Sequence, residues 1–514
     1  MTAIHSAIFS WVKVARRSPW APLAWLAIWL LFSAPWRPLL LPDEGRYASV
    51  AYEMWLGDGL VPTLNGLPFF HKPPLLYWLG MAGMSILGVH EAAVRLGPAL
   101  GAWLMGAALF LHLRRTRSEA QARIGLGILA TMPFFFVGAQ YVNHDMGVAG
   151  CITAAILAAV RALEGSQRRP WMVLAWVFCG LGVLAKGLIG IVLPGLVVLP
   201  WLLFQRRGRD ALRLFDPLGL IAFLAIAGPW FWAMQVRYPD FFDYFFLEQH
   251  FRRYASASFN NRQPVWFLIG VLPLLTIPWS LSFIPWTGFR SAALRIQNRL
   301  DATTWLYLWW LMVIVGFFSI PESKLVGYIL PSLAPCAALA AEQLKNQARL
   351  TRGLMGVAAC FCLSLVGTLA WLAPHSSKEP ALVLRAQMHP GDRVVFVDDY
   401  FYDVAFYARL SSPAWVISDW NDPGIRERDN WRKELHDAQR FARKTQQNVL
   451  WLRDRENEIW CHEGTIWFLS RHDLFDRWPQ QAPLHKIAEN ANVQLWQGRG
   501  QACPLNFLKH PGDP

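Results

Sequence analysis

The sequence predicts a polytopic α-helical membrane protein of about 11 to 13 transmembrane helices, followed by a small C-terminal α/β domain outside the bilayer. Of the 514 residues, 54% are hydrophobic and 16% are charged. The chain carries 28 Trp and 32 Phe, and its apolar runs reach the length of about 20 residues that spans the hydrocarbon core. After about residue 375, charges become frequent and no long apolar run remains.

The predicted spans are eleven stretches that lack Asp, Glu, Lys and Arg. They begin near Trp20, Leu96, Ile124, Met146, Trp171, Gly187, Pro217, Pro264, Ala302, Leu325 and Gly353. The first is long and aromatic and lacks a small-residue cleavage site, so we interpret it as a retained span rather than a signal peptide. A twelfth apolar stretch, Leu75–His90, has the length at which a re-entrant or interfacial helix competes with a true span.

The placement of basic residues decides how this twelfth stretch is interpreted. If Leu75–His90 is not a span, the basic N-terminus and five basic loops all fall on one side, which is the positive-inside arrangement of an inner-membrane protein. If it is a span, the five loops fall outside. We therefore predict a cytoplasmic N-terminus and a helix against the outer face at Leu75–His90. The basic loops contain Arg114/Arg115/Arg117, Arg168/Arg169, Arg206/Arg207/Arg209, Arg290/Arg295/Arg299 and Lys345/Arg349.

This topology divides the chain into a membrane domain, 1–374, and a periplasmic α/β domain, 375–514. Polar loops 42–74 and 237–263 of the membrane domain also face the periplasm. The net charge of +13 then reflects topology and lipid phosphates rather than a nucleic-acid partner.

In the second domain, two segments have the pattern of short buried strands and one has that of a helix. The strands are Arg393–Asp398 and Asn448–Arg453, and the helix is Trp431–Lys444. We interpret Asp398 and Asp399 as a strand end. Cys461 and Cys503 could form a disulfide on the periplasmic side, whereas the other five cysteines lie in apolar runs as small hydrophobic residues.

The first outer loop holds the most informative residues. Asp43 and Glu44 follow the first span directly, and carboxylates at a bilayer boundary are costly unless they are solvated, paired or functional. They either begin a solvated helix or supply a general base whose pKa is set by partial burial and cationic neighbours. Lys72 precedes two prolines, which hold the backbone rigid, and a fixed ammonium near the membrane suits phosphate recognition.

These motifs resemble those of the aminoarabinose-transferase-like family, which belongs to the GT-C membrane glycosyltransferases together with the protein O-mannosyltransferases. The resemblance covers residues 20–374. It implies that Asp43, Glu44 and Asp145 are catalytic and that the substrate pocket includes Arg46, Tyr47 and Tyr77. The motifs are Asp43-Glu44-Gly45-Arg46-Tyr47, Asn65-Gly66 and Lys72-Pro73-Pro74-Leu75-Leu76-Tyr77-Trp78.

Later motifs follow in the family's order, and each also has a structural alternative. Asp145, in Asn143-His144-Asp145, could instead be a helix N-cap. Lys186 could snorkel at a helix end. The segment Phe246–Tyr254 could be an interfacial amphipathic stretch. The resemblance implies that the donor phosphate is bound by Lys72, Lys186, Arg253, Lys324 and Tyr328, the last two in Ser323-Lys324-Leu325-Val326-Gly327-Tyr328.

One position departs from the family pattern. Family members often carry Glu directly before Lys-Pro-Pro, and a metal has been described between that acid and a histidine of the later outer loop. Here the position is His71, and His250 is the candidate partner. Two imidazoles could hold Zn²⁺ with further ligands, or the substitution could mean that no metal binds. We expect no required cofactor.

The resemblance implies transfer of a sugar from a polyprenyl-phosphate donor to lipid A, another envelope glycan or a protein, with inversion at the anomeric carbon. The leaving phosphate needs charge stabilisation, which fixed cations supply in a low-dielectric site, and Asp43 is the expected base. A transporter or flippase of lipid-linked sugars is the main alternative, although its charges would be expected near the bilayer midplane within inverted repeats. A membrane scaffold would leave the matched acids and lysines unexplained.

Overall fold

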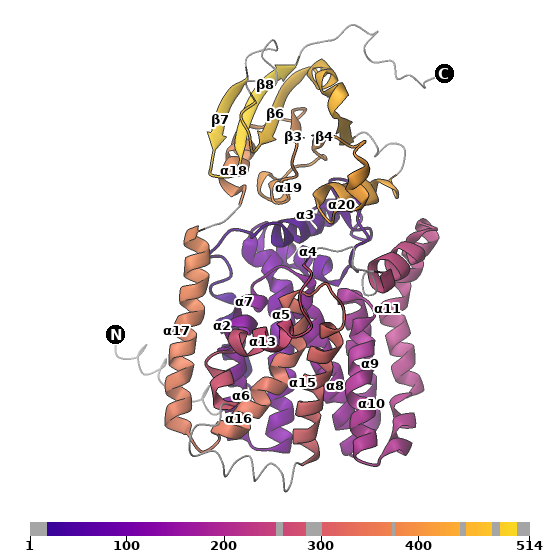
Figure 1. Ribbon diagram of the computed structural model, residues 1–514, viewed down its shortest axis with the longest axis vertical. Helices are drawn as coiled ribbons and strands as arrows, with labels where there is room; N and C mark the ends of the chain where they lie inside the picture. The colour runs from indigo at the N-terminus through magenta and orange to yellow at the C-terminus, as the bar shows by residue number, and fades with distance from the viewer. Residues whose placement is uncertain are drawn as a thin grey trace.

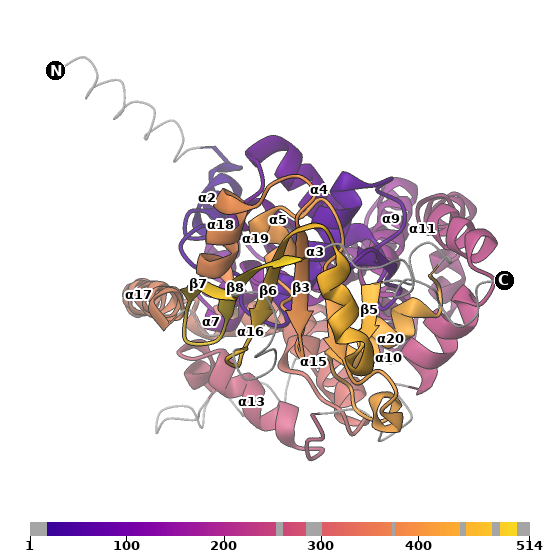
Figure 2. The ribbon, with the colours of Figure 1, turned by 90° about the horizontal axis from the view of Figure 1, so that it is seen from above.

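The computed structural model describes residues 18–252, 261–283, 301–372, 376–442, 449–474 and 484–500. A bundle of helices forms one part, and a sheet-containing C-terminal part stands at one end of it (Figure 1). Viewed from that end, the sheet lies over the bundle (Figure 2). The predicted fold class, a polytopic helical protein with a C-terminal α/β domain, is confirmed.

Among the described residues, six helices are long and apolar enough to cross a membrane. A seventh span would combine α6 (Glu119–Ala130) and α7 (Pro133–Ala139), which are bent by 70°. The bend occurs where Pro133 begins α7, since proline disfavours the helical conformation of the residue before it. The six helices are α5 (Glu91–Thr116), α8 (His144–Glu164), α9 (Arg168–Lys186), α11 (Pro217–Arg237), α15 (Ala302–Ser319) and α17 (Ala348–Leu372).

The other predicted spans contain shorter helices, so all eleven apolar stretches are helical at least in part. Several of these shorter helices hold internal prolines, which remove helix hydrogen bonds and shorten the regular segments. Taken together, the shorter helices of these spans are α2 (Ala21–Leu31), α10 (Ile189–Phe204), α13 (Phe267–Leu275) with η3 (Trp279–Phe283), and η4 (Val326–Ser332) leading into α16 (Leu333–Leu344).

The bundle has a buried centre and an apolar outer surface. The central helix α8 packs against α5 and α9, and Gly101 and Gly150 bring the α5 and α8 backbones close together. At the edge of the bundle (Figure 1), α17 exposes Val357, Phe361 and Trp371. Exposed apolar side chains of this kind suit a helix that faces lipid.

The basic loops meet at the end of the bundle opposite the C-terminal part (Figure 1). Arg115, at the end of α5, lies 2.7 Å from Glu164 at the end of α8. Arg207, between α10 and η1 (Gly208–Leu214), donates to the Leu163 carbonyl at 2.8 Å. The loops that carry these arginines therefore lie on one side, as predicted. Residues 284–300, with a further basic cluster, lie outside the described residues.

A short helix and a hairpin fill the space between the two parts. The hairpin strands β1 (Thr63–Leu64) and β2 (Leu67–Pro68) follow α3 (Asp43–Leu56). Their turn residues Asn65 and Gly66 have φ of 55° and 73°, the conformation of a tight hairpin turn. The 13-residue α4 (Leu75–Leu87) lies at the C-terminal-domain end rather than across the bundle (Figure 1), in agreement with the predicted surface helix.

The C-terminal part contains a six-stranded mixed sheet of order β5-β4-β3-β6-β8-β7. Both predicted strands and the predicted helix are present among its elements. Cys461 is disulfide-bonded, whereas Cys503 lies outside the described residues, so the pairing of these two cysteines stays a prediction. The elements are α18 (Lys378–Gln387), β3 (Arg393–Val397), α19 (Val404–Ala408), β4 (Trp415–Ser418), η5 (Pro423–Arg426), α20 (Trp431–Gln439), β5 (Leu450–Leu452), η7 (Arg453–Cys461), β6 (Gly464–Ser470), β7 (His485–Glu489) and β8 (Gln494–Gly500).

The C-terminal part is docked on α3 and the hairpin through buried contacts. Trp467 of the sheet shares one apolar cluster with Tyr52 of α3. The Asn65 side chain exchanges two hydrogen bonds of 2.9 Å with the Ala414 backbone. The Ser49 hydroxyl donates to the Tyr402 carbonyl at 2.6 Å. These contacts hold the C-terminal part in a defined position over the helical bundle.

Candidate functional site

A cavity of about 660 Å³ lies between the helical bundle and the C-terminal part. The bundle contributes residues from six separate segments, and many of them belong to the sequence motifs. These residues are Leu41, Pro42, Asp43, Arg46, Tyr47, His71, Lys72, Asn143, His144, Asp145, Lys186, Asn261, Leu325 and Tyr328.

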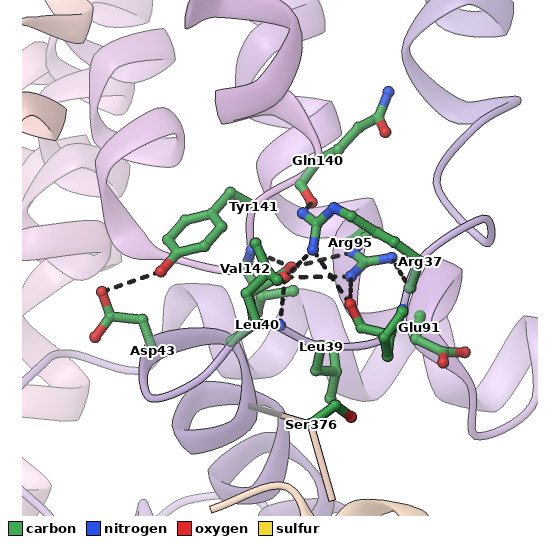
Figure 3. A network of polar contacts seen from close by, with 12 residues as sticks. Arg37, Leu39, Leu40, Asp43, Glu91, Arg95, Gln140, Tyr141, Val142 and Ser376 are labelled. Carbon is green, nitrogen blue, oxygen red and sulfur yellow. Dashed lines mark hydrogen bonds and ion pairs between the residues drawn. The ribbon is translucent and has the colours of Figure 1, made fainter. Parts of the chain in front are cut away.

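Asp43 lies in the first turn of α3 and lines this cavity. The Tyr141 hydroxyl donates to its Oδ2 at 3.4 Å, an interaction drawn in Figure 3. The Arg46 guanidinium lies 3.6 Å from its Oδ1, and the Asp43 side chain remains 36% exposed. The positive end of the helix also favours a negative charge at this position. Asp43 is therefore an oriented carboxylate that substrate can reach.

Glu44, the adjacent acid, was expected to be catalytic, but it does not line the cavity. Its side chain is fully buried and pairs with Arg37 and Arg95. Burial alone would raise the pKa of Glu44, but the charges of Arg95 and Arg37 outweigh it and lower the pKa to about 2. The carboxylate also accepts from the backbone N–H groups of Leu40 at 2.9 Å and Val142 at 3.0 Å.

The same network joins three segments behind the cavity wall (Figure 3). Arg37 donates to the Gln140 carbonyl at 2.7 Å, ahead of α8. Arg95, on α5, donates to the Pro38 carbonyl at 2.9 Å and to the Arg37 carbonyl at 2.8 Å. Glu44 is consequently a positioning residue, because it anchors the segments that carry Asp43 and Tyr141.

Asp145 and Lys186 form a second charged group in the cavity wall. They pair directly, from the start of α8 and the end of α9. The Lys186 ammonium also lies 4.5 Å from the centre of the Tyr328 ring, within reach of a cation–π contact. The N-cap of α8 is Asn143, whose Nδ2 donates to Asp145 Oδ2 at 2.8 Å. The alternative roles of Asp145 as N-cap and Lys186 as a snorkelling residue therefore do not describe this structure.

The glycine of the Ser-Lys-Leu-x-Gly-Tyr motif has a role beside this pair. A Cβ atom at Gly327 would lie 2.8 Å from the carboxyl carbon of Asp145. Only a glycine lets the η4 backbone approach this carboxylate so closely. The motif thus delivers Tyr328 to Lys186 and leaves space for Asp145.

Two histidines and Tyr47 complete the wall next to Lys72. The His71 ring lies 4.4 Å from the Phe69 ring, centre to centre. His144 contacts the rings of Tyr47 at 4.6 Å and Tyr77 at 5.2 Å, both edge to face. Tyr47 lines the cavity, as expected for the substrate pocket. Tyr77 is fully buried and lies behind Tyr47 and His144, so it supports the pocket and does not form its surface.

Lys324 also departs from its expected place. Its side chain is 3% exposed and does not line the cavity. Its ammonium donates to the Gln263 carbonyl at 2.8 Å and to the Pro321 carbonyl at 2.5 Å. Because these carbonyls already satisfy the buried ammonium, Lys324 ties two loops together instead of facing a phosphate. Arg253 lies outside the described residues.

The predicted metal site is tested only in part. Within the described ranges, no group of three or more His, Cys, Asp or Glu is arranged to hold a metal ion. His71 lines the cavity, but the side chain of His250 on η2 (Asp243–Arg252) is outside the described set. Metal binding by this pair stays a prediction.

The C-terminal part closes the cavity, and the sequence analysis missed this contribution. Glu434 of α20 lies 3.0 Å from Arg46 and accepts from the Tyr402 hydroxyl at 2.6 Å. Burial raises the pKa of Glu434 despite the opposing effect of Arg46. Asp399, interpreted as a strand end, pairs with Arg471 at the rim. The cavity residues from this part are Asp399, Tyr400, Tyr402, Asp429, Asn430, Trp431, Glu434 and Arg471.

A sequence signal for Glu434 does exist. Trp431, Leu435 and Ala438 form an apolar stripe at helical spacing, and Glu434 lies on that stripe. A carboxylate on the buried face of a helix usually has a partner. The partner, Arg46, lies 388 positions earlier in the chain, and no local pattern connects the two.

A polytopic bundle with a sheet domain over a charged cavity at one end defines a membrane protein of the GT-C type. A model of the family described as dolichyl-phosphate-mannose-protein mannosyltransferase matches residues 71–232. The crystal structure of ArnT from Cupriavidus metallidurans bound to undecaprenyl phosphate has the same fold. Its TM-score is 0.78 at 23% identity, covering 95% of this chain and 98% of that chain.

The chain belongs to the aminoarabinose-transferase family. It is similar to the undecaprenyl phosphate-alpha-4-amino-4-deoxy-L-arabinose arabinosyl transferase of Aeromonas salmonicida, with 32% identity over 70% of this chain and 68% of the relative. The protein of that name from Pseudomonas aeruginosa is 32% identical over 66% of this chain and 61% of the relative. The chain thus spans about three-fifths of the length of that relative. The family resemblance drawn from the motifs is confirmed.

Proposed function

We propose that this protein is a glycosyltransferase that moves a sugar from a polyprenyl-phosphate donor to an acceptor of the bacterial envelope such as lipid A. One observation carries the proposal. Asp43, Lys72, Asp145 and Lys186 come from four separate segments and line one cavity at the end of the bundle. The names of the relatives, which specify an undecaprenyl-phosphate sugar, support a donor of this class.

The donor phosphate would lie against Lys72 and Lys186. When the anomeric bond to the phosphate breaks, the phosphate takes the electron pair and gains negative charge. Two fixed ammonium groups stabilise that charge strongly in a cavity partly closed to water. Asp145 holds Lys186 in place and Tyr328 stacks against it. These two residues therefore position the cation that faces the leaving group.

Asp43 would act on the acceptor. For a hydroxyl acceptor, Asp43 takes the proton as the oxygen attacks the anomeric carbon, and for a phosphate acceptor it orients the nucleophile. Tyr141 and Arg46 hold the carboxylate in its position. Asp145 is engaged by Lys186, and Asp43 is assigned as the base rather than as a covalent nucleophile. In this assignment a single displacement inverts the anomeric centre.

The positive-inside rule supports the orientation. The basic loops lie at the end of the bundle opposite the cavity (Figure 1), and such loops are retained in the cytoplasm. We therefore assign the cavity and the C-terminal domain to the periplasmic face of the inner membrane and the N-terminus to the cytoplasm.

The test is transfer of sugar by the full chain in lipid nanodiscs that contain a polyprenyl-phosphate sugar and lipid A. Asp43→Asn is expected to lower the rate by about 10² to 10⁴-fold, the typical contribution of a general base. The matched control is Asp58→Asn, an outer-loop acid that pairs with Arg237 outside the cavity. Full activity of Asp43→Asn would remove Asp43 from the reaction. Movement of the lipid-linked sugar across the bilayer without transfer would favour a flippase.

A second variant tests the donor site. Lys186→Ala is expected to raise the KM for the donor more than the KM for the acceptor, because the ammonium faces the donor phosphate. The opposite pattern would contradict the assignment of the two subsites.

A further inference from the structure

A second cavity of about 620 Å³ opens within the bundle, between α2, α5, α8 and α9. Its wall is mostly apolar, with side chains such as Trp103, Leu111 and Leu157. Charged residues, Arg115 and Arg161, lie at one end of this wall. We refer to it as the α2–α9 groove.

The groove has the depth of one membrane leaflet. On α5 it runs from Trp103 to Arg115, and twelve residues of α-helix rise about 18 Å. The hydrocarbon core is about 30 Å thick, so one leaflet contributes about 15 Å. The arginine end belongs to the side of the bundle where the basic loops meet. A lipid of that leaflet would thus place its head group at the arginines and one acyl chain along the apolar wall.

The polar end of the groove carries more positive than negative charge. Arg115 is paired with Glu164 at 2.7 Å. The Arg161 guanidinium stacks 4.0 Å above the Trp171 ring, and within the described ranges no carboxylate lies within ion-pair distance of it. Arg161 can therefore hold an anionic head group and keep its contact with Trp171.

The groove is separate from the candidate active site. Both include residues of α8, but Asp145 lies at its start and Arg161 lies sixteen residues later. This separation corresponds to about 24 Å along the helix. The groove and the cavity share no lining residue.

We propose that the α2–α9 groove binds one anionic glycerophospholipid of the leaflet on the basic side. The phosphate pairs with Arg161 and Arg115, and one acyl chain lies against Leu111 and Leu157. Basic pockets between transmembrane helices are recognised sites for phospholipid head groups. The bound lipid would join α2 and α9 to the central pair α5 and α8 at the end remote from the cavity.

Native mass spectrometry of the full chain, released from nanodiscs, tests this proposal. Nanodiscs of phosphatidylglycerol are compared with nanodiscs of phosphatidylcholine that has the same acyl chains. The wild-type chain is expected to retain one phosphatidylglycerol and to show a preference for it. Arg161→Ala is expected to weaken retention about fivefold, since each basic residue at a membrane surface contributes about 1 kcal/mol. Equal retention of both lipids by the wild-type chain would overturn the proposal.

Two further variants keep the result decisive if Arg161→Ala folds poorly. Ala24→Trp places a large ring in the groove from an exposed position of α2 and leaves both arginines intact. It is expected to abolish retention, and unchanged retention would overturn the proposal. Arg352→Ala is the control, because Arg352 is an exposed arginine near the start of α17, at the basic end but outside the groove. If Arg352→Ala lost as much phosphatidylglycerol as Arg161→Ala, the preference would come from general surface charge, and the proposal of a defined site would be overturned.

Discussion

Replacement of Glu44 by Gln separates structural from chemical roles in the adjacent pair Asp43 and Glu44. Glu44 lies between two guanidinium groups, with Arg95 Nε 3.0 Å from its Oε1 and both side chains fully buried. A glutamine offers one acceptor oxygen, and its amide group would face donors on Arg37 and Arg95. Removing one partner of a buried ion pair costs about 3 to 5 kcal/mol, because the remaining charge has no compensation.

The pKa of Glu44 provides an independent value for the loss of folding free energy in Glu44→Gln. It is lowered from 4.5 to about 2, and each pKa unit corresponds to 1.36 kcal/mol. The folded state is therefore stabilised by about 3 kcal/mol through the charged carboxylate. For an acid with a lowered pKa, this stabilisation is present above the unfolded pKa and is lost as the pH falls toward 2. The two approaches agree that Glu44→Gln should lower the free energy of unfolding by about 3 kcal/mol at pH 7.

Thermal unfolding of the full chain in nanodiscs is the assay, with Asp43→Asn as the matched variant one position earlier. Glu44→Gln should unfold at a clearly lower temperature but retain transfer activity in its folded fraction. Asp43→Asn should unfold near the wild-type temperature, since its side chain is 36% exposed, and should lose transfer. A Glu44→Gln variant with wild-type stability and no activity would refute the structural role and assign Glu44 to the reaction.

Three further outcomes are expected. Gly327→Ala should slow transfer about 10²-fold by displacing the Asp145 carboxylate, since misplacement by about 1 Å can have that effect. Gly316→Ala, which has open space around its Cβ position, should leave the transfer rate unchanged, and equal rates of the two variants would contradict the steric argument. Burial raises the pKa of Asp403 from 3.8 to about 6, so its charged form destabilises the fold as pH rises through this range. Asp403→Asn should therefore raise the free energy of unfolding by about 3 kcal/mol at pH 7.5 and have little effect on it below pH 4. An equal effect at both pH values would rule out the titration of Asp403 as its cause. Lys324→Met should lower the unfolding temperature and leave the donor KM of the folded enzyme unchanged, while a raised donor KM at unchanged stability would restore Lys324 to the phosphate site.

Much of the architecture could be predicted from the sequence because the bilayer imposes local rules. A long run without charges becomes a helix wherever it lies, and basic loops collect on one side, so both could be inferred without any tertiary contact. The strand at Arg393–Val397 and the helix at Trp431–Gln439 likewise follow from local periodicity. The length of each regular helix is harder to infer from the apolar stretch that contains it. Helices α13 and η4 are shortened at prolines, and the bend between α6 and α7 depends on how these helices pack.

The assignment of roles within motifs required the tertiary structure. Asp43 and Glu44 are neighbours in the chain, but successive helix residues point about 100° apart; one reaches the cavity and the other meets Arg37 and Arg95. Lys324 belongs to a motif as informative as that of Lys186, and only its contact with two carbonyls explains why it does not face the cavity.

The sequence by itself determined the membrane class, the helical stretches, the gathering of basic loops and the charged bundle residues that line the site. The tertiary structure decided which acids and cations face the cavity and that the C-terminal domain forms its roof through Glu434 and its neighbours. The physical reason is that hydrophobicity and backbone preference act between residues close in sequence, whereas ion pairing and burial act between residues that only folding brings together.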